Sequence, residues 1–230
     1  VGNPMVTFSH SRDGNTAVHA AVRNLSGIWS PSATVVNVGN NFGFGPEPDF
    51  AVDASGNAIA VWRQYDSVRF SIMSRRYTPA GGWEMPVELT LPSNQNGLAP
   101  RVAMDGNGNA FALWHEFDGS SYAIWAARFD SVLGWIDLDL ISSPALFFGD
   151  DSTLPQIAFD AAGNAIAAWT KYVSAINRTV VRANAFQLGS GWVGGETISG
   201  GNAGYGVARL ARIAVSPSGS AVVTWAEEDV

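Results

Sequence analysis

The 230-residue chain has no cysteine, few charged residues and no long apolar run. Without cysteine, disulfide bonds and thiolate metal sites are excluded. Charged residues make up 14% of the chain and hydrophobic residues 47%, which excludes a disordered chain of low hydropathy and high charge. The longest apolar stretches are only as long as a strand, and a membrane-spanning helix needs roughly 18 apolar residues. We therefore expect no membrane-spanning helix.

Basic residues are also scarce. The chain contains 13 Lys and Arg against 20 Asp and Glu, which gives a net charge of −7. Nucleic-acid binding needs a basic face, so this balance argues against nucleic acid as a partner. No segment of the sequence shows a helical period over ten or more residues, and this favours an all-β fold.

What the sequence does contain is a repeat of about 54 residues, marked by two series of aromatic residues. One series has spacings of 54, 52, 55 and 56 residues and consists of Phe8, Trp62, Trp114, Trp169 and Trp225. The other has spacings of 54, 52 and 57 residues and consists of Trp29, Trp83, Trp135 and Trp192. Two independent series with one period indicate four copies of a unit and a partial fifth.

Each unit is predicted to contain four short strands. In the second copy they end at Asp53, run from Ala58 to about Trp62, run from Arg69 to Tyr77, and follow Gly82-Trp83. The segment from Asp53 to Asn57 predicts a hairpin, because Asp opens a type I turn and Gly56 supplies the left-handed position that closes it. The same pattern recurs from Asp105 to Asn109 and from Asp160 to Asn164, and in weaker form from Ser216 to Ser220.

Four-stranded units repeating at this length predict an all-β propeller, whose blades are arranged around an axis. We expect small residues such as Ala60 in the inner strands, and a tryptophan such as Trp114 between adjacent blades. Residues 1–230 are predicted to form a single propeller domain or a fragment of one. Its expected parts are a partial blade at 1–45, blades at 46–97, 98–152 and 153–206, and a partial blade at 207–230.

The strand count leaves ring closure open. The first strand of the unit appears four times, the second five times, and the third and fourth four times each. One alternative is an incomplete ring, completed by a second copy of the chain or by the remainder of a longer chain, since an unpaired blade edge invites association. The other is a self-contained ring of four or five blades.

The unit Pro-x-x-Ala-x-Asp-x-x-Gly-Asn-Ala-x-Ala-x-Trp, followed by Ile-x-Ala-x-Arg-Tyr and Gly-Trp, resembles a repeat found in uncharacterised secreted and surface proteins of Gram-negative bacteria. The resemblance covers nearly the whole chain. It implies a bacterial propeller that is extracellular, on the cell surface or in the periplasm, and it implies no catalytic residues. A more distant similarity is to sialidase-like propellers, although the sialidase pattern Ser-x-Asp-x-Gly-x-Thr-Trp is not matched.

Residue patterns for metal binding and catalysis have simpler interpretations here. Asp105, Asn107, Asn109 and Glu116 have the spacing of calcium ligands in an EF-hand loop, but Ala110 stands where that loop needs glycine, which favours a structural turn. The chain has three histidines and none lies in a nucleophile-elbow motif. We expect no metal, no cofactor and no catalytic residue. A glycoside hydrolase would need a pair of carboxylates, and no spacing singles out such a pair.

The connections between the second and third strands carry polar and aromatic residues, which suit the apolar faces and polar edges of sugars. The ordinary alternative is a set of solvated hairpin tips. The candidate ligand-binding residues are His10, Arg12, Arg63, Tyr65, Asp66, His115, Glu116, Asp118, Lys171 and Tyr172. The sequence thus predicts a non-catalytic extracellular module that binds a glycan or a protein partner. The first alternative is a purely structural unit of a larger surface protein or assembly, and the second is a sialidase-like glycoside hydrolase.

Overall fold

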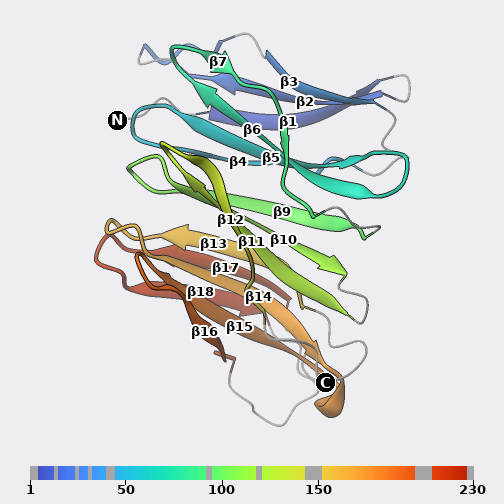
Figure 1. Cartoon of the computed structure of the whole chain (residues 1–230), viewed down its shortest axis with the longest axis vertical. Coiled ribbons are helices and arrows are strands. Elements are labelled where there is room, and N and C mark those ends of the chain that lie inside the picture. The colour runs from blue at the N-terminus through green and yellow to red at the C-terminus, as the bar shows by residue number, and fades with distance from the viewer. Residues whose placement is uncertain are drawn as a thin grey trace.

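The chain folds as an all-β propeller of successive antiparallel sheets (Figure 1). The computed structural model describes residues 5–12, 15–23, 26–30, 33–39, 45–91, 95–117, 121–142, 152–199 and 209–226. The one helical segment among these residues is a 3₁₀ turn at Ser174–Ile176. This confirms the fold class that the repeat predicts.

Each sheet is built from consecutive strands of the chain. The first sheet contains β1 (Met5–Arg12), β2 (Asn15–Val22) and β3 (Ala33–Gly39). The second contains β4 (Asp49–Val52), β5 (Ala58–Tyr65), β6 (Phe70–Thr78), β7 (Gly82–Trp83) and β8 (Val87–Glu88). Here β7 and β8 both pair with β6, where the sequence predicted one strand. The interruption falls at Pro86, which has no backbone N–H to donate to a ladder.

The remaining sheets repeat this order. The third contains β9 (Gly97–Met104), β10 (Ala110–Phe117), β11 (Tyr122–Asp130) and β12 (Gly134–Leu140). The fourth contains β13 (Ser152–Phe159), β14 (Ala165–Val173), β15 (Arg178–Gln187) and β16 (Gly191–Thr197). The last contains β17 (Arg209–Val215) and β18 (Ala221–Ala226). The proposed blade limits stay a prediction, as does the way in which a ring would close.

The sheets fan out around their first strands. Strand β4 contacts β9, β9 contacts β13, and β13 contacts β17, so these strands are the inner ones. In Figure 1 the first sheet lies near the top of the long axis and the last two sheets lie in the lower half. Among the described residues, no strand of the last sheet pairs with a strand of the first.

The predicted hairpin between the first two strands is confirmed. Asp53 Oδ1 accepts hydrogen bonds from the amides of Ser55 and Asn57 at 2.8 and 2.9 Å, and Asn57 Nδ2 donates to Asp53 Oδ2 at 2.7 Å. Gly56 has a φ of 85°, a value that favours glycine. The turns that begin at Asp105 and Asp160 make the same set of bonds. The spacing from Asp to Asn in the sequence thus corresponds to a hydrogen-bonded turn in the structure.

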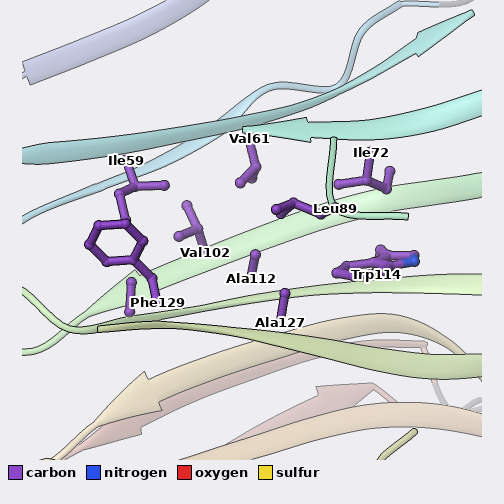
Figure 2. Close-up of a cluster of buried hydrophobic side chains, with 10 residues drawn as sticks. Ile59, Val61, Ile72, Leu89, Val102, Ala112, Trp114, Ala127 and Phe129 are labelled. Atoms are coloured by element: carbon purple, nitrogen blue, oxygen red, sulfur yellow. The ribbon is translucent and has the colours of Figure 1, made fainter. Parts of the chain in front are cut away.

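The core lies between neighbouring sheets. Ile59 and Val61 of the second sheet pack with Ala112 and Trp114 of the third, and all four side chains are fully buried (Figure 2). Trp62 and Trp169 are fully buried in the same way at the junctions on either side. The prediction that tryptophan fills the space between blades is therefore confirmed. Ala60 and Ala112 are buried small residues, but they lie in the second strands β5 and β10 and not in the inner strands.

Candidate functional site

Three inner strands share an unusual backbone conformation at their beginning. Glu47, Ala99 and Leu154 have φ values of 47°, 49° and 56°, and each directly precedes a proline. A residue before proline favours extended backbone, and non-glycine residues rarely adopt positive φ. Strain of this kind is concentrated at functional sites. The start of the inner strands is therefore the first place to look for a site.

Glu47 and Arg63 form an ion pair at this edge. Arg63 Nη2 lies 3.2 Å from Glu47 Oε1, and Arg63 Nε donates to the carbonyl of Gly45 at 2.9 Å. Glu47 Oε2 accepts a hydrogen bond from the amide of Ala99 at 3.2 Å, so this carboxylate bridges the second and third sheets. Because both oxygens of Glu47 are engaged, its orientation is fixed.

A second carboxylate, Asp49, lies against the same inner strand of the third sheet. Asp49 Oδ2 accepts a hydrogen bond from the amide of Val102 at 2.9 Å. Burial raises the pKa of the half-buried Asp49 carboxyl, an effect larger than the opposing influence of the Val102 amide and the Arg101 charge. Asp49 therefore retains a proton to higher pH than an ordinary aspartate.

His115 completes the group. Its side chain is only 8% exposed, and its ring meets the edge of Tyr122 at 5.3 Å between ring centroids. Burial, together with the charges of Arg63 and Arg101, lowers the pKa of His115 from 6.5 to about 4. His115 is thus neutral near pH 7, and its Nδ1 is buried without a hydrogen-bond partner in the described structure. We call Glu47, Asp49, Arg63, Arg101 and His115 the axial cluster.

The tip of the hairpin between β5 and β6 lies beside this cluster. The Tyr65 and Phe70 rings pack 5.2 Å apart, and the Arg63 guanidinium lies 5.1 Å from the centre of the Phe70 ring. Asp66 Oδ1 accepts the amides of Val68 and Arg69, and these bonds lower the pKa of Asp66. The two partly buried aromatic residues of the tip therefore pack on one another, and Phe70 also packs on Arg63.

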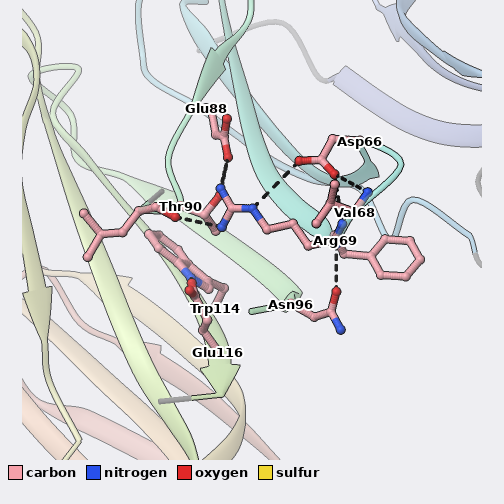
Figure 3. Close-up of polar contacts among 10 residues, drawn as sticks. Asp66, Val68, Arg69, Glu88, Thr90, Asn96, Trp114 and Glu116 are labelled. Carbon is pink, nitrogen blue, oxygen red and sulfur yellow. Dashed lines mark hydrogen bonds and ion pairs between the residues drawn. The ribbon is translucent and has the colours of Figure 1, made fainter. Parts of the chain in front are cut away.

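A buried arginine ties this hairpin tip to the end of its own sheet (Figure 3). Arg69 Nη2 lies 2.6 Å from Glu88 Oε1, and Arg69 Nη1 donates to the carbonyl of Leu91 at 2.7 Å. Below it, Trp114 Nε1 donates to the buried carboxylate of Glu116 at 3.0 Å. Glu116 therefore holds the tryptophan of the junction in place.

The fourth sheet departs from this arrangement. Lys171, which is buried, occupies the position that corresponds to Glu116 and offers no acceptor, and the indole Nε1 of Trp169 is buried without a partner in the described structure. The Tyr172 hydroxyl lies 2.7 Å from Asn177 Oδ1, within its own hairpin.

The predicted ligand-binding residues thus fall into several groups. Arg63 and His115 meet in the axial cluster, while Tyr65 and Asp66 lie at the neighbouring tip. Glu116 supports a junction, and Lys171 and Tyr172 belong to the next sheet. His10 and Arg12 lie in β1 but their side chains are outside the described part of the chain, and Asp118 is outside it altogether. Their assignment to a ligand stays a prediction.

Sequence reasoning missed Glu47, Asp49 and Arg101. A signal was present in the aligned repeats, because one column at the start of the inner strand contains Asp49, Arg101, Gln156 and Arg212. The residues around this column are apolar or small, so a charged or polar side chain there in every copy marks a surface that is not core.

Two other site classes receive no support from the described residues. No group of three or more His, Asp or Glu side chains is gathered there as metal ligands would be. The described part of the chain also has no helix that is long and apolar enough to cross a membrane.

No family model matches the chain, and no curated protein matches it. Among solved structures, the chain is similar to a protein of unknown function from Dyadobacter fermentans, with 10% identity over 97% of this chain and 71% of that one and a TM-score of 0.58. It is also similar to an α-L-arabinofuranosidase of Fusarium graminearum. The structure of that enzyme in complex with an iminosugar inhibitor matches with 9% identity over 78% of this chain and 55% of that one, at a TM-score of 0.53.

The same enzyme in complex with arabinobiose matches with 12% identity over 98% of this chain and 80% of that one, at a TM-score of 0.50. At such identities the likeness shows the propeller fold alone. It nevertheless corrects one expectation, because these structural neighbours include glycoside hydrolases. The prediction of a non-catalytic binding module, with no enzyme activity, is therefore wrong as the leading interpretation.

Proposed function

We propose that the chain is a glycoside hydrolase that cleaves a glycosidic bond at the axial cluster. The observation that carries the proposal is the pair of carboxylates in different environments, with the pKa of Asp49 raised by burial and Glu47 paired with Arg63. Glycosidases use two carboxyl groups, of which one donates a proton and the other acts as a base or nucleophile.

The two carboxylates bind the same inner strand of the third sheet. They accept hydrogen bonds from the amides of Ala99 and Val102, which are three residues apart on one strand. A chain of three residues spans at most about 10 Å, so the two amides lie close together on strand β9. Both carboxylates therefore lie beside the same short stretch of strand β9.

Each residue then has a role in the reaction. Asp49 donates its proton to the glycosidic oxygen as the bond to the leaving sugar breaks. Glu47, oriented by Arg63 and the Ala99 amide, removes a proton from the attacking water or attacks the sugar carbon directly. Neutral His115 and the Tyr65 ring offer a hydrogen-bonding edge and an apolar face to the sugar.

The substrate is proposed to be a glycan, and α-L-arabinofuranosides are the first to test because a structural neighbour is named as an arabinofuranosidase. A sialoside is the second, since the sequence resembles sialidase-like propellers distantly. An extracellular location stays a prediction that agrees with a glycan substrate.

The test is turnover of a panel of nitrophenyl glycosides by the chain and its variants. We expect Asp49→Asn to lower kcat by about 10²- to 10⁴-fold on a nitrophenyl substrate, and less on a dinitrophenyl substrate whose leaving group needs little protonation. Glu47→Gln should lower both rates. The control is Asp137→Asn, an exposed carboxylate on the outer strand β12. Absence of turnover on every glycoside, or full activity of both axial variants, would refute the proposal.

A further inference from the structure

The junctions between neighbouring sheets all have one construction. Each sheet turns the face that carries its strand-end tryptophan toward the preceding sheet, as Trp114 does toward Ile59 and Val61. We call this the leading face. The opposite face, which in the second sheet carries Ile59, Val61 and Ile72, is the trailing face. Trp62 and Trp169 repeat the arrangement at two further junctions and are fully buried.

The leading face of the first sheet is exposed. Phe8 occupies the position of Trp62 in the repeat, and its side chain is 42% exposed, while Trp62 is fully buried. Val6 and Trp29 are each 44% exposed. Phe8 and Val6 take the positions of Trp62 and Ala60, which are fully buried against a neighbouring sheet. Scattered exposed apolar residues are normal, but a set at repeat-equivalent buried positions is not.

The trailing face of the last sheet is exposed in the same way. Val222 pairs with Ala214 as Ile59 pairs with Ala51, which places Val222 at the position of Ile59. Ile59 is fully buried, whereas Val222 is 63% exposed. The described structure therefore presents the two complementary halves of its own repeated junction, one at each end of the row of sheets.

The strands that form these two halves contain no acidic residue. The chain has a net charge of −7, which makes two copies repel each other. None of its 20 Asp and Glu residues falls in the strands of the first sheet or in the last hairpin, Arg209–Ala226. The charged residues of these strands are Arg12, Arg209 and Arg212, so the contact would depend on the apolar faces and on continuity with the established packing between sheets, and not on charge.

We infer that the chain associates head to tail with a second copy of itself, the leading face of the first sheet in one copy packing on the trailing face of the last sheet in the other. The new junction continues the established packing between sheets, with Phe8 in the place of tryptophan. Such a contact is heterologous, so it builds a ring if the rotation closes and a filament if it does not.

The experiment is light scattering of the chain over roughly a hundredfold range of concentration, with one charged substitution on each face. The wild-type mass should rise above the 24.3 kDa of one chain as concentration increases. Phe8→Asp and Val222→Asp should each stay at one chain. The control is Val132→Asp, because the Val132 side chain is 87% exposed in the turn before β12. This variant should associate as the wild type does.

Mixing the two variants gives the decisive result. Phe8→Asp keeps an intact trailing face and Val222→Asp an intact leading face, so an equimolar mixture should form a species of two chains and none larger. Circular dichroism of each variant verifies that it is folded. A wild-type chain that stays at one chain throughout, as expected if another segment covers these faces, would overturn the inference. Association that survives Val222→Asp, or mixed variants that fail to pair, would overturn the head-to-tail arrangement.

Discussion

Protonation of His115 should destabilise the folded chain, and this follows directly from its surroundings. The imidazole is 8% exposed and lies near the charges of Arg63 and Arg101, which together with burial lower its pKa from 6.5 to about 4. In the unfolded chain the same group titrates near its ordinary value. Between these two pKa values the unfolded state binds more protons than the folded state, so stability must fall as the pH falls.

The magnitude can be worked out from the two pKa values. The histidine contributes no pH dependence well above pH 6.5. At pH 5 the unfolded state gains about 2 kcal/mol from protonation that the folded state does not gain, and at pH 4 the difference reaches about 3 kcal/mol. Because a small domain has only about 5–15 kcal/mol of total stability, this loss is large enough to measure.

The assay is urea unfolding monitored by tryptophan fluorescence at pH 7, 6, 5 and 4, for the wild type and for His115→Gln. Carboxylates titrate in the same range, but they are common to both proteins, so their contribution cancels in the difference. We expect the gap in free energy of unfolding between the two proteins to shift by about 2 kcal/mol in favour of the variant between pH 7 and pH 5. Parallel pH profiles would refute the placement of a buried neutral imidazole.

Three substitutions test the packing. Trp114→Ala should lower the free energy of unfolding by about 3–5 kcal/mol, because the side chain is fully buried between two sheets, and a loss below about 1 kcal/mol in a denaturant series would contradict that placement. Gly97→Ala should cost about 1–3 kcal/mol, since its Cβ would lie 2.7 Å from Ile72 Cγ1, while Gly106→Ala, with nothing within 4 Å, serves as the matched control. Asp105→Ala should cost about 1–3 kcal/mol in the same measurement, because it leaves the turn amides without their acceptor; an effect no larger than that of Gly106→Ala would argue against the turn.

The fold could be predicted because the repeat encodes local physics. The turn from Asp53 to Asn57 closes through bonds within five residues, and its copies at Asp105 and Asp160 do the same. A tryptophan equivalent to Trp114 recurs at a fixed interval in the sequence because each sheet needs one large side chain at its junction with the preceding sheet. Both signals depend on positions within one unit, and a periodic sequence reveals such positions directly.

The site was harder to predict because it depends on contacts between units. Asp49 acquires its raised pKa from burial against the next sheet, and its hydrogen bond reaches Val102, 53 residues away in the sequence. Glu47 likewise reaches Ala99, 52 residues away. Within its own segment Asp49 is one acidic residue among several. Arg63 and His115 were named as candidates because each follows a landmark tryptophan, whereas no landmark marks the start of the inner strand.

Packing between the sheets restricts which positions of the repeat can carry functional side chains. Positions at the junctions accept only side chains that fit between two sheets, so Ala60, Ala112 and Ala167 recur as small residues with no exposure. The column of Asp49, Arg101, Gln156 and Arg212 faces no such restriction, and each copy carries a different charge or polarity from its neighbour. A catalytic pair needs two unlike environments, and Glu47 and Asp49 differ in theirs, since Glu47 is paired with Arg63 and Asp49 is half-buried. We therefore expect the proposed chemistry in a column where the copies differ, such as the one that contains Asp49 and Arg101.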